Sequence, residues 1–208
     1  ASVLAMRQTD LKTALAYTTL MALGTSTLFL AGSTPYALTA AVTFLIVHSL
    51  YKAALFMVVG NIDHGTGTRD AESLGGLARK MPLTALSMAG LPPFRGWIGK
   101  ELLYAGAQDL SPSALITGGV LIANALMFAV AAIVALAPFF GAVRKTPQTP
   151  HEADWRMLAG PLLLAALGLL AGLSAPVLQP LIDQTVTGSL AQSKAAGLHL
   201  WGGFNLPL

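Results

Sequence analysis

Four ionisable side chains stand inside long apolar stretches of the sequence, where a charge is costly. They are Lys12, His48, Lys52 and Lys100, and the acidic Glu101 follows the last of them. Burying an ionisable group in a bilayer costs several kcal/mol, so such residues face the interior of a helix bundle or a water-filled path. Lysine and histidine can take up and release protons in such places. These residue types therefore predict that protons or cations move through the chain.

His48 and Lys52 stand near the centre of the apolar stretch 36–62. A helix of about 27 residues is roughly 40 Å long, so side chains at its centre do not easily reach the headgroups. The i, i+4 spacing places both on one helix face, where an imidazole and an ammonium can pass protons. A structural histidine bonded to a backbone carbonyl is the alternative for His48. Lys12 lies near the start of its stretch, so snorkelling to the headgroups remains open for it.

Lys100 and Glu101 follow a segment that cannot form one continuous helix. The segment contains Gly90, Pro92, Pro93, Gly96 and Gly99, and glycine and proline both disfavour a helix interior. Broken membrane helices are tolerated where the backbone lines a cavity, and they mark ion sites in transporters. The alternative is a surface turn with a solvated Lys-Glu pair, which the apolar residues on both sides disfavour.

The loop at 61–70, NIDHGTGTRD, contains three further candidates, Asp63, His64 and Asp70. Charged loop residues between helix ends can form the entrance of a transport path and attract cations to it. A charge-balanced loop that satisfies its own hydrogen bonds is the alternative. Both interpretations of these residues remain open.

The elements that must position these residues are membrane helices. Hydrophobic residues make up 54% of the 208 residues and charged residues only 10%, whereas soluble domains carry about a quarter charged residues. The fold class that we predict is all-α, a polytopic transmembrane bundle with one broken helix. We expect residues 1–208 to be a fragment of a single domain. Its predicted passages are 11–30, 36–62, 82–107 (broken), 114–140 and 157–182, and 198–208 begins another.

The loop charges predict an orientation and exclude other functions. Counting passages collects on one side Arg7, Arg69, Arg79, Lys80, Arg144, Lys145 and Arg156, whereas the other side has Lys194 alone among basic residues. Such asymmetry predicts that the basic side is cytoplasmic, and it explains the pI of about 9.4 better than a nucleic-acid partner does. The chain has no cysteine, and its histidines lack the spacing of metal ligands. We therefore predict no metal site.

Three stretches together resemble a known family. QTDLKTALAYTT (8–19), HSLYKAALFMVVG (48–60) and GLPPFRGWIGKE (90–101) resemble the ordered motifs of the antiporter-like subunits. Mrp cation/proton antiporters, membrane-bound hydrogenases and respiratory complex I share these subunits. The stretches IDHGTGTRD (62–70), TPHEADW (149–155) and LWGGFNLPL (200–208) resemble the large A-type component of Mrp complexes.

The resemblance implies a subunit of a multisubunit antiporter that exchanges Na⁺ for protons, with neither an enzymatic reaction nor a cofactor. Its partners would be the other subunits of the complex, and its location a bacterial inner membrane that the chain crosses several times. The family's midplane polar chain implies roles for the residues here numbered Lys12, His48, Lys52 and Lys100. The alternative is a proton-pumping membrane subunit of a complex I-like NADH:quinone oxidoreductase or of a membrane-bound hydrogenase.

The sequence departs from the family pattern at two points. Phe44 stands where the family often has a second histidine. The half-helix 83–91 is about two helical turns shorter than the family pattern implies. This segment is therefore either compressed or carries a deletion.

Overall fold

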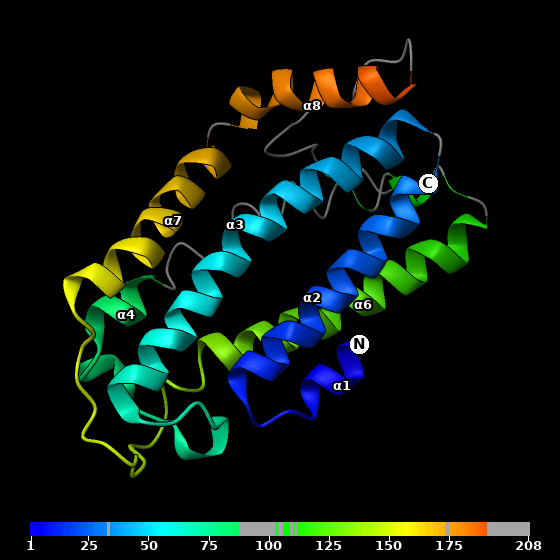
Figure 1. The fold of residues 1–208 in the computed structure, drawn as a ribbon. Coiled ribbons are helices and arrows are strands. Elements are labelled where there is room, and N and C mark those ends of the chain that lie inside the picture. Colours follow the sequence, from blue (N-terminus) through cyan, green and yellow to red (C-terminus); the bar gives the residue numbers. More distant parts are fainter. Residues whose placement is uncertain are drawn as a thin grey trace. The chain divides into compact units, whose positions relative to one another are not determined.

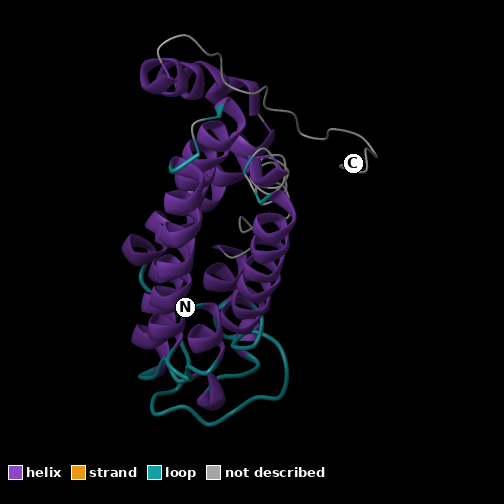
Figure 2. Ribbon diagram, turned by 90° about the vertical axis from the view of Figure 1, so that its right-hand side faces the viewer, coloured by secondary structure: helices purple, strands orange, loops and turns teal. Residues whose placement is uncertain are grey.

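The computed structural model describes residues 1–32, 34–87, 103, 106–108, 110, 112–173 and 175–190. Its main elements are α1 (Ser2–Met6), α2 (Leu11–Leu30), α3 (Pro35–Thr66), α4 (Pro82–Ser87), α6 (Ser113–Ala135), α7 (Trp155–Leu173) and α8 (Ala175–Leu190), with 3-10 turns at Ala71–Ser73 and Leu77–Arg79. Figures 1 and 2 show these helices and no strand among the described residues. Among the described residues, Asp10 and Asp70 form one isolated antiparallel β-bridge. The all-α prediction is confirmed.

Three of the described helices are long and apolar enough to cross a membrane. They are α2, α3 and α6, with 20, 32 and 23 residues. About 20 apolar residues suffice to span the hydrocarbon core. Trp155–Gly168 is also apolar but shorter. The predicted class, an all-helical protein with several membrane spans, is confirmed, and the number of passages beyond these three stays a prediction.

The helix bounds follow the predicted stretches in part. α2 covers the stretch 11–30, and α3 extends four residues beyond position 62. α6 ends at Ala135 instead of continuing to 140, because Pro138 has no N–H to donate and disfavours helical backbone before it. The stretch 157–182 falls on two helices, α7 and α8. Lys100, Glu101, the break before them and the stretch 198–208 lie outside the described residues.

The chain divides into two compact units. The first draws on Ala1–Met21, Leu50–Leu91 and Asn124–Leu167, and the second on Ala22–Ser49, Pro92–Ala123 and Gly168–Leu208. A core of buried apolar side chains from α2, α3, α6 and the loops fills the first unit, including Leu11, Leu15, Leu55, Val58, Ile62, Leu77, Met81 and Val134.

Caps fix the helix ends in the first unit. Asp10 Oδ1 accepts a hydrogen bond from Thr13 N at 2.8 Å and so caps the start of α2. Gly67 follows the end of α3 with φ 72°, which a residue with a Cβ rarely adopts. The carboxylate of Glu152 accepts hydrogen bonds from the backbone N–H groups of Leu83, at 2.7 Å, and Thr84, at 3.2 Å. A loop residue distant in sequence thus caps the start of α4.

The loops of the first unit pack against one another at the helix ends (Figure 2). Leu77 N donates to Pro138 O at 3.1 Å, and Gln148 N donates to Thr66 O at 3.0 Å. Arg144 donates to the backbone oxygen of Glu72. The start of α2 and the end of α3 are joined by the Asp10–Asp70 bridge. The loops that the sequence assigned to one basic side therefore lie together.

Candidate functional site

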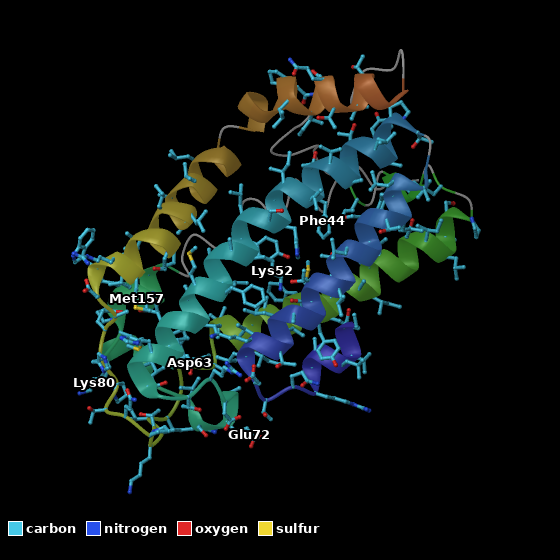
Figure 3. The ribbon with its side chains drawn as sticks, in the orientation of Figure 1. Phe44, Lys52, Asp63, Glu72, Lys80 and Met157 are labelled. Atoms are coloured by element: carbon cyan, nitrogen blue, oxygen red, sulfur yellow. The ribbon has the colours of Figure 1, made fainter. Side chains whose placement is uncertain are left out.

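The ammonium of Lys52 is buried within the first unit, between the parts of α2 and α3 that belong to this unit. Lys52 lies on α3 and is only 6% exposed. Its Nζ donates to the backbone oxygen of Leu15 on α2 at 3.0 Å and to Thr18 Oγ1. Figure 3 labels Lys52 at the middle of α3. The sequence predicted that this lysine faces the interior of a helix bundle or a water-filled path, and the structure places it against α2.

The polar contact lies among apolar side chains. Leu15 is 1% exposed and Thr18 is 2% exposed. Leu11, Leu55 and Val58 of the same unit belong to the buried core around the two helices. A buried charge is tolerated only when hydrogen bonds replace the water it has lost. The carbonyl and the hydroxyl on α2 provide that replacement, and they place a group that can gain or lose a proton inside the membrane-spanning part of the chain.

His48 lies one turn before Lys52 on the same helix and is 5% exposed. It belongs to the second unit, where its ring lies 5.8 Å from the ring of Phe44, measured between centroids. The aromatic residue that replaces the family's second histidine therefore packs against the first. α3 is continuous through both positions, so helical periodicity keeps His48 and Lys52 on one face. A proton relay by this pair stays a prediction.

Lys12 belongs to a charged cluster where α2 begins, which we call the Asp63 cluster and define as Asp10, Lys12, Asp63 and Arg69. Lys12 Nζ lies 3.4 Å from Asp63 Oδ2, and Arg69 Nη1 lies 3.8 Å from the same oxygen. Arg69 Nε also donates to Asp10. All four side chains are partly exposed. Asp63, labelled in Figure 3, thus takes two cationic neighbours from two different segments.

Two groups of this cluster have shifted pKa values: the hydrogen bond from Arg69 to Asp10 and the charge of Asp10 raise the pKa of Arg69, and the pKa of Asp10 is lowered. Burial raises the pKa of Asp10, but hydrogen bonds from Thr13 and Arg69 and the charge of Arg69 together lower it below its ordinary value. The carboxylate form of Asp10 is therefore favoured, and this form holds Arg69 beside Asp63. The stability that the Asp10 carboxylate contributes is fully present above the pKa that Asp10 has in the unfolded chain. It is lost as the pH falls through the lower pKa that Asp10 has in the folded protein.

The other two candidates of the 61–70 loop lie in different surroundings. The carboxylate of Asp70 accepts a hydrogen bond from Ser73 Oγ at 2.6 Å and caps the 3-10 turn Ala71–Ser73. The loop thus uses Asp70 for its own hydrogen bonds, as the structural alternative predicted. The ring of His64 lies 6.0 Å from the ring of His151, edge to face. A role for Asp63, His64 and Asp70 in collecting cations stays a prediction.

Sequence reasoning missed the residues that hold the predicted lysines. Thr18 lies in the same motif as Lys12 and three residues after Leu15 on α2, so periodicity put it on the face of Leu15. That spacing was a usable signal. The ion pair between Asp10 and Arg69 spans 59 positions, and a pairing over such a distance leaves no local pattern. Lys100 and Glu101 lie outside the described residues.

Comparison with known proteins identifies relatives of this chain. Residues 1–126 match the family described as NADH:quinone oxidoreductase/Mrp antiporter, TM. The A1 component of the Na⁺/H⁺ antiporter of Staphylococcus saprophyticus is 35% identical over 98% of this chain, and the A component of the Na⁺/H⁺ antiporter of Alkalihalophilus pseudofirmus is 32% identical over 100% of it. A solved structure of the Mrp complex from a Dietzia species matches 98% of this chain with 35% identity and a TM-score of 0.69.

The chain spans only part of each of these proteins. It covers 29% and 31% of the two curated relatives and 23% of the matched chain in the solved structure. The two alignments extend over 237 and 246 positions, more than the 208 residues of this chain. Both relatives therefore carry residues within the matched region that this chain lacks. The chain belongs to the family of membrane subunits that NADH:quinone oxidoreductases and Mrp antiporters share.

Proposed function

We propose that this chain is part of a subunit of a multisubunit Na⁺/H⁺ antiporter and that it moves protons by way of Lys12, His48, Lys52 and Lys100. Glu101 would tune the last of these lysines. The observation that carries the proposal is the buried ammonium of Lys52, which hydrogen-bonds Leu15 O and Thr18 Oγ1 of the neighbouring helix. A group of this kind inside a membrane span is costly, and transport explains its presence better than packing does.

The similarity to antiporter subunits supports the same proposal. Relatives named as the A or A1 components of Na⁺/H⁺ antiporters match nearly the whole chain. The other subunits of an Mrp-type complex would be the protein partners, and Na⁺ and H⁺ the transported ions. The location would be the inner membrane of a bacterial cell, which the chain would cross several times. On this proposal the chain takes part in secondary transport and performs no enzymatic reaction.

The proposal is tested on the complete complex that contains this chain, reconstituted in liposomes without NADH or quinone. A Na⁺ gradient alone should drive proton movement, which a pH-sensitive dye inside the liposomes reports. Replacing Na⁺ with K⁺ or choline in parallel liposomes identifies the transported cation. Proton movement that does not depend on any cation gradient and requires NADH oxidation would instead identify a subunit of a redox-driven pump, the alternative that the NADH:quinone oxidoreductase in the family's description suggests.

The predicted orientation can be tested by thiol labelling in a cysteine-free background of the complete complex, because residues 1–208 contain no cysteine. Glu72 and Thr149 are exposed in the basic loops, and Ala31 is exposed just beyond the other end of α2. In intact cells a membrane-impermeant thiol reagent should label Ala31→Cys and leave Glu72→Cys and Thr149→Cys unlabelled. Inverted vesicles should give the opposite pattern. Labelling of Glu72→Cys from outside the cell would refute the cytoplasmic assignment.

A further inference from the structure

One carbonyl oxygen on α2 receives an unusual number of donors. Leu15 O accepts hydrogen bonds from Lys52 Nζ at 3.0 Å, from Thr18 Oγ1 at 2.8 Å and from Thr19 Oγ1 at 3.1 Å. In an α-helix the same oxygen also faces the backbone N–H four residues later. A carbonyl oxygen has two lone pairs. Four donors therefore compete for this oxygen, and one of them can leave at little cost.

The hydroxyl of Thr18 has the freedom to be that donor. A hydroxyl carries one proton to donate and two lone pairs to accept, and it can rotate. In the structure Thr18 Oγ1 donates to Leu15 O and accepts from Lys52 Nζ. This arrangement suits a charged ammonium, which has donors and no acceptor. When Lys52 loses a proton, the neutral amine gains a lone pair, and the hydroxyl can turn to donate to it.

We propose that Thr18 is a positioning residue that holds Lys52 in both of its protonation states, by accepting from the ammonium and donating to the amine. The proposal rests on the proposed transport function and adds a residue to it. One proton leaves or joins Lys52 in the transport step, while the proton of Thr18 only changes its acceptor, from Leu15 O to Lys52 Nζ. Thr18 is 2% exposed, so no bulk water is at hand to replace its hydroxyl.

Several other titratable groups lie on the elements around Lys52. α2 carries Lys12 and Tyr17, and α3 carries Tyr36, His48, Tyr51, Asp63 and His64. Neither α6 nor α4 has a titratable side chain within Ser113–Ala135 or Pro82–Ser87. Tyr51 Oη lies 3.5 Å from Met127 Sδ on α6. The side-chain group that Lys52 Nζ contacts is the hydroxyl of Thr18. This hydroxyl can accept a hydrogen bond from the ammonium and donate one to the neutral amine.

Thr18→Val removes the hydroxyl with little change of shape, and Thr19→Val is its matched control. Thr19 also donates to Leu15 O but makes no bond to Lys52 among those found for the described residues. In vesicles with the complete complex, Thr18→Val should lower Na⁺-dependent proton movement about tenfold. The pH profile should move toward acid by about one unit, because the ammonium loses more than the amine does. Thr18→Ser and Thr19→Val should resemble the natural protein.

Each outcome of this experiment bears on one of the two proposals. Equal losses in Thr18→Val and Thr19→Val, or a pH profile that stays in place, would overturn the positioning role. If Thr18→Val does not assemble, Thr18→Ala removes the same hydroxyl and is measured in its place. Normal transport by the Thr18 variants together with a transport-dead Lys52→Met would refute only the role of Thr18. Normal transport by Lys52→Met would refute the transport proposal itself.

Discussion

Replacing Lys52 with methionine in the complete complex is expected to lower Na⁺-dependent proton movement by at least about a hundredfold, the usual size of a lost proton-transfer group. Methionine fills a similar volume, so the buried core around α2 and α3 stays packed. What it lacks is the amine beside Leu15 O and Thr18 Oγ1 that we propose as the proton carrier. The measurement is dye-reported proton movement in inverted vesicles, normalised to the amount of assembled complex.

The matched control is Lys80→Met, which removes the same charge from an exposed loop position of the first unit. It should leave transport unchanged. A Lys52→Met variant that transports normally would mean that the buried ammonium has a structural role.

His48 extends this prediction along α3. His48→Ala should also depress transport, because His48 lies one helical turn from Lys52 on the same face. If the two residues pass one proton in series, the double variant should be little worse than either single variant. Losses that add fully would show that the two act independently.

The helices and the buried lysine were predictable because their cause is local. A continuous apolar stretch in water-free surroundings must form a helix to satisfy its own backbone, so the helices over 11–30 and 36–62 could be assigned from composition. The cost of a lysine at the centre of such a stretch predicted that Lys52 faces the interior of a helix bundle or a water-filled path. That the partners are Leu15 O and Thr18 depends on how α2 packs against α3, which no local pattern encodes.

The rest of the fold depended on contacts between distant segments. The carboxylate of Glu152 caps the start of α4. It accepts hydrogen bonds from two backbone N–H groups that lie 69 and 68 positions away in the sequence. The end of α6 was predicted too late, because hydropathy continues through Phe139 and Phe140 although Pro138 ends the helix. Apolar character alone therefore marks where a helix can run, and turn residues decide where it stops.

Lys12 is the second residue for which we expect a large effect, and its ion pair allows two roles to be separated. Lys12 Nζ lies 3.4 Å from Asp63 Oδ2. An arginine at this position can form the same ion pair, but a guanidinium does not release its proton. If Lys12 carries protons, Lys12→Arg should assemble normally and lower Na⁺-dependent proton movement by at least about a hundredfold, as Lys12→Ala should.

The snorkelling interpretation of Lys12 predicts the opposite result for the arginine variant. A long basic side chain that only anchors the start of α2, or only pairs with Asp63, functions equally well as arginine. The matched control is Arg69→Lys, which keeps a positive charge near Asp63 and Asp10 within the same cluster and should retain transport. Retained transport in Lys12→Arg would show that a fixed positive charge suffices at the start of α2, and the proton path would then exclude Lys12.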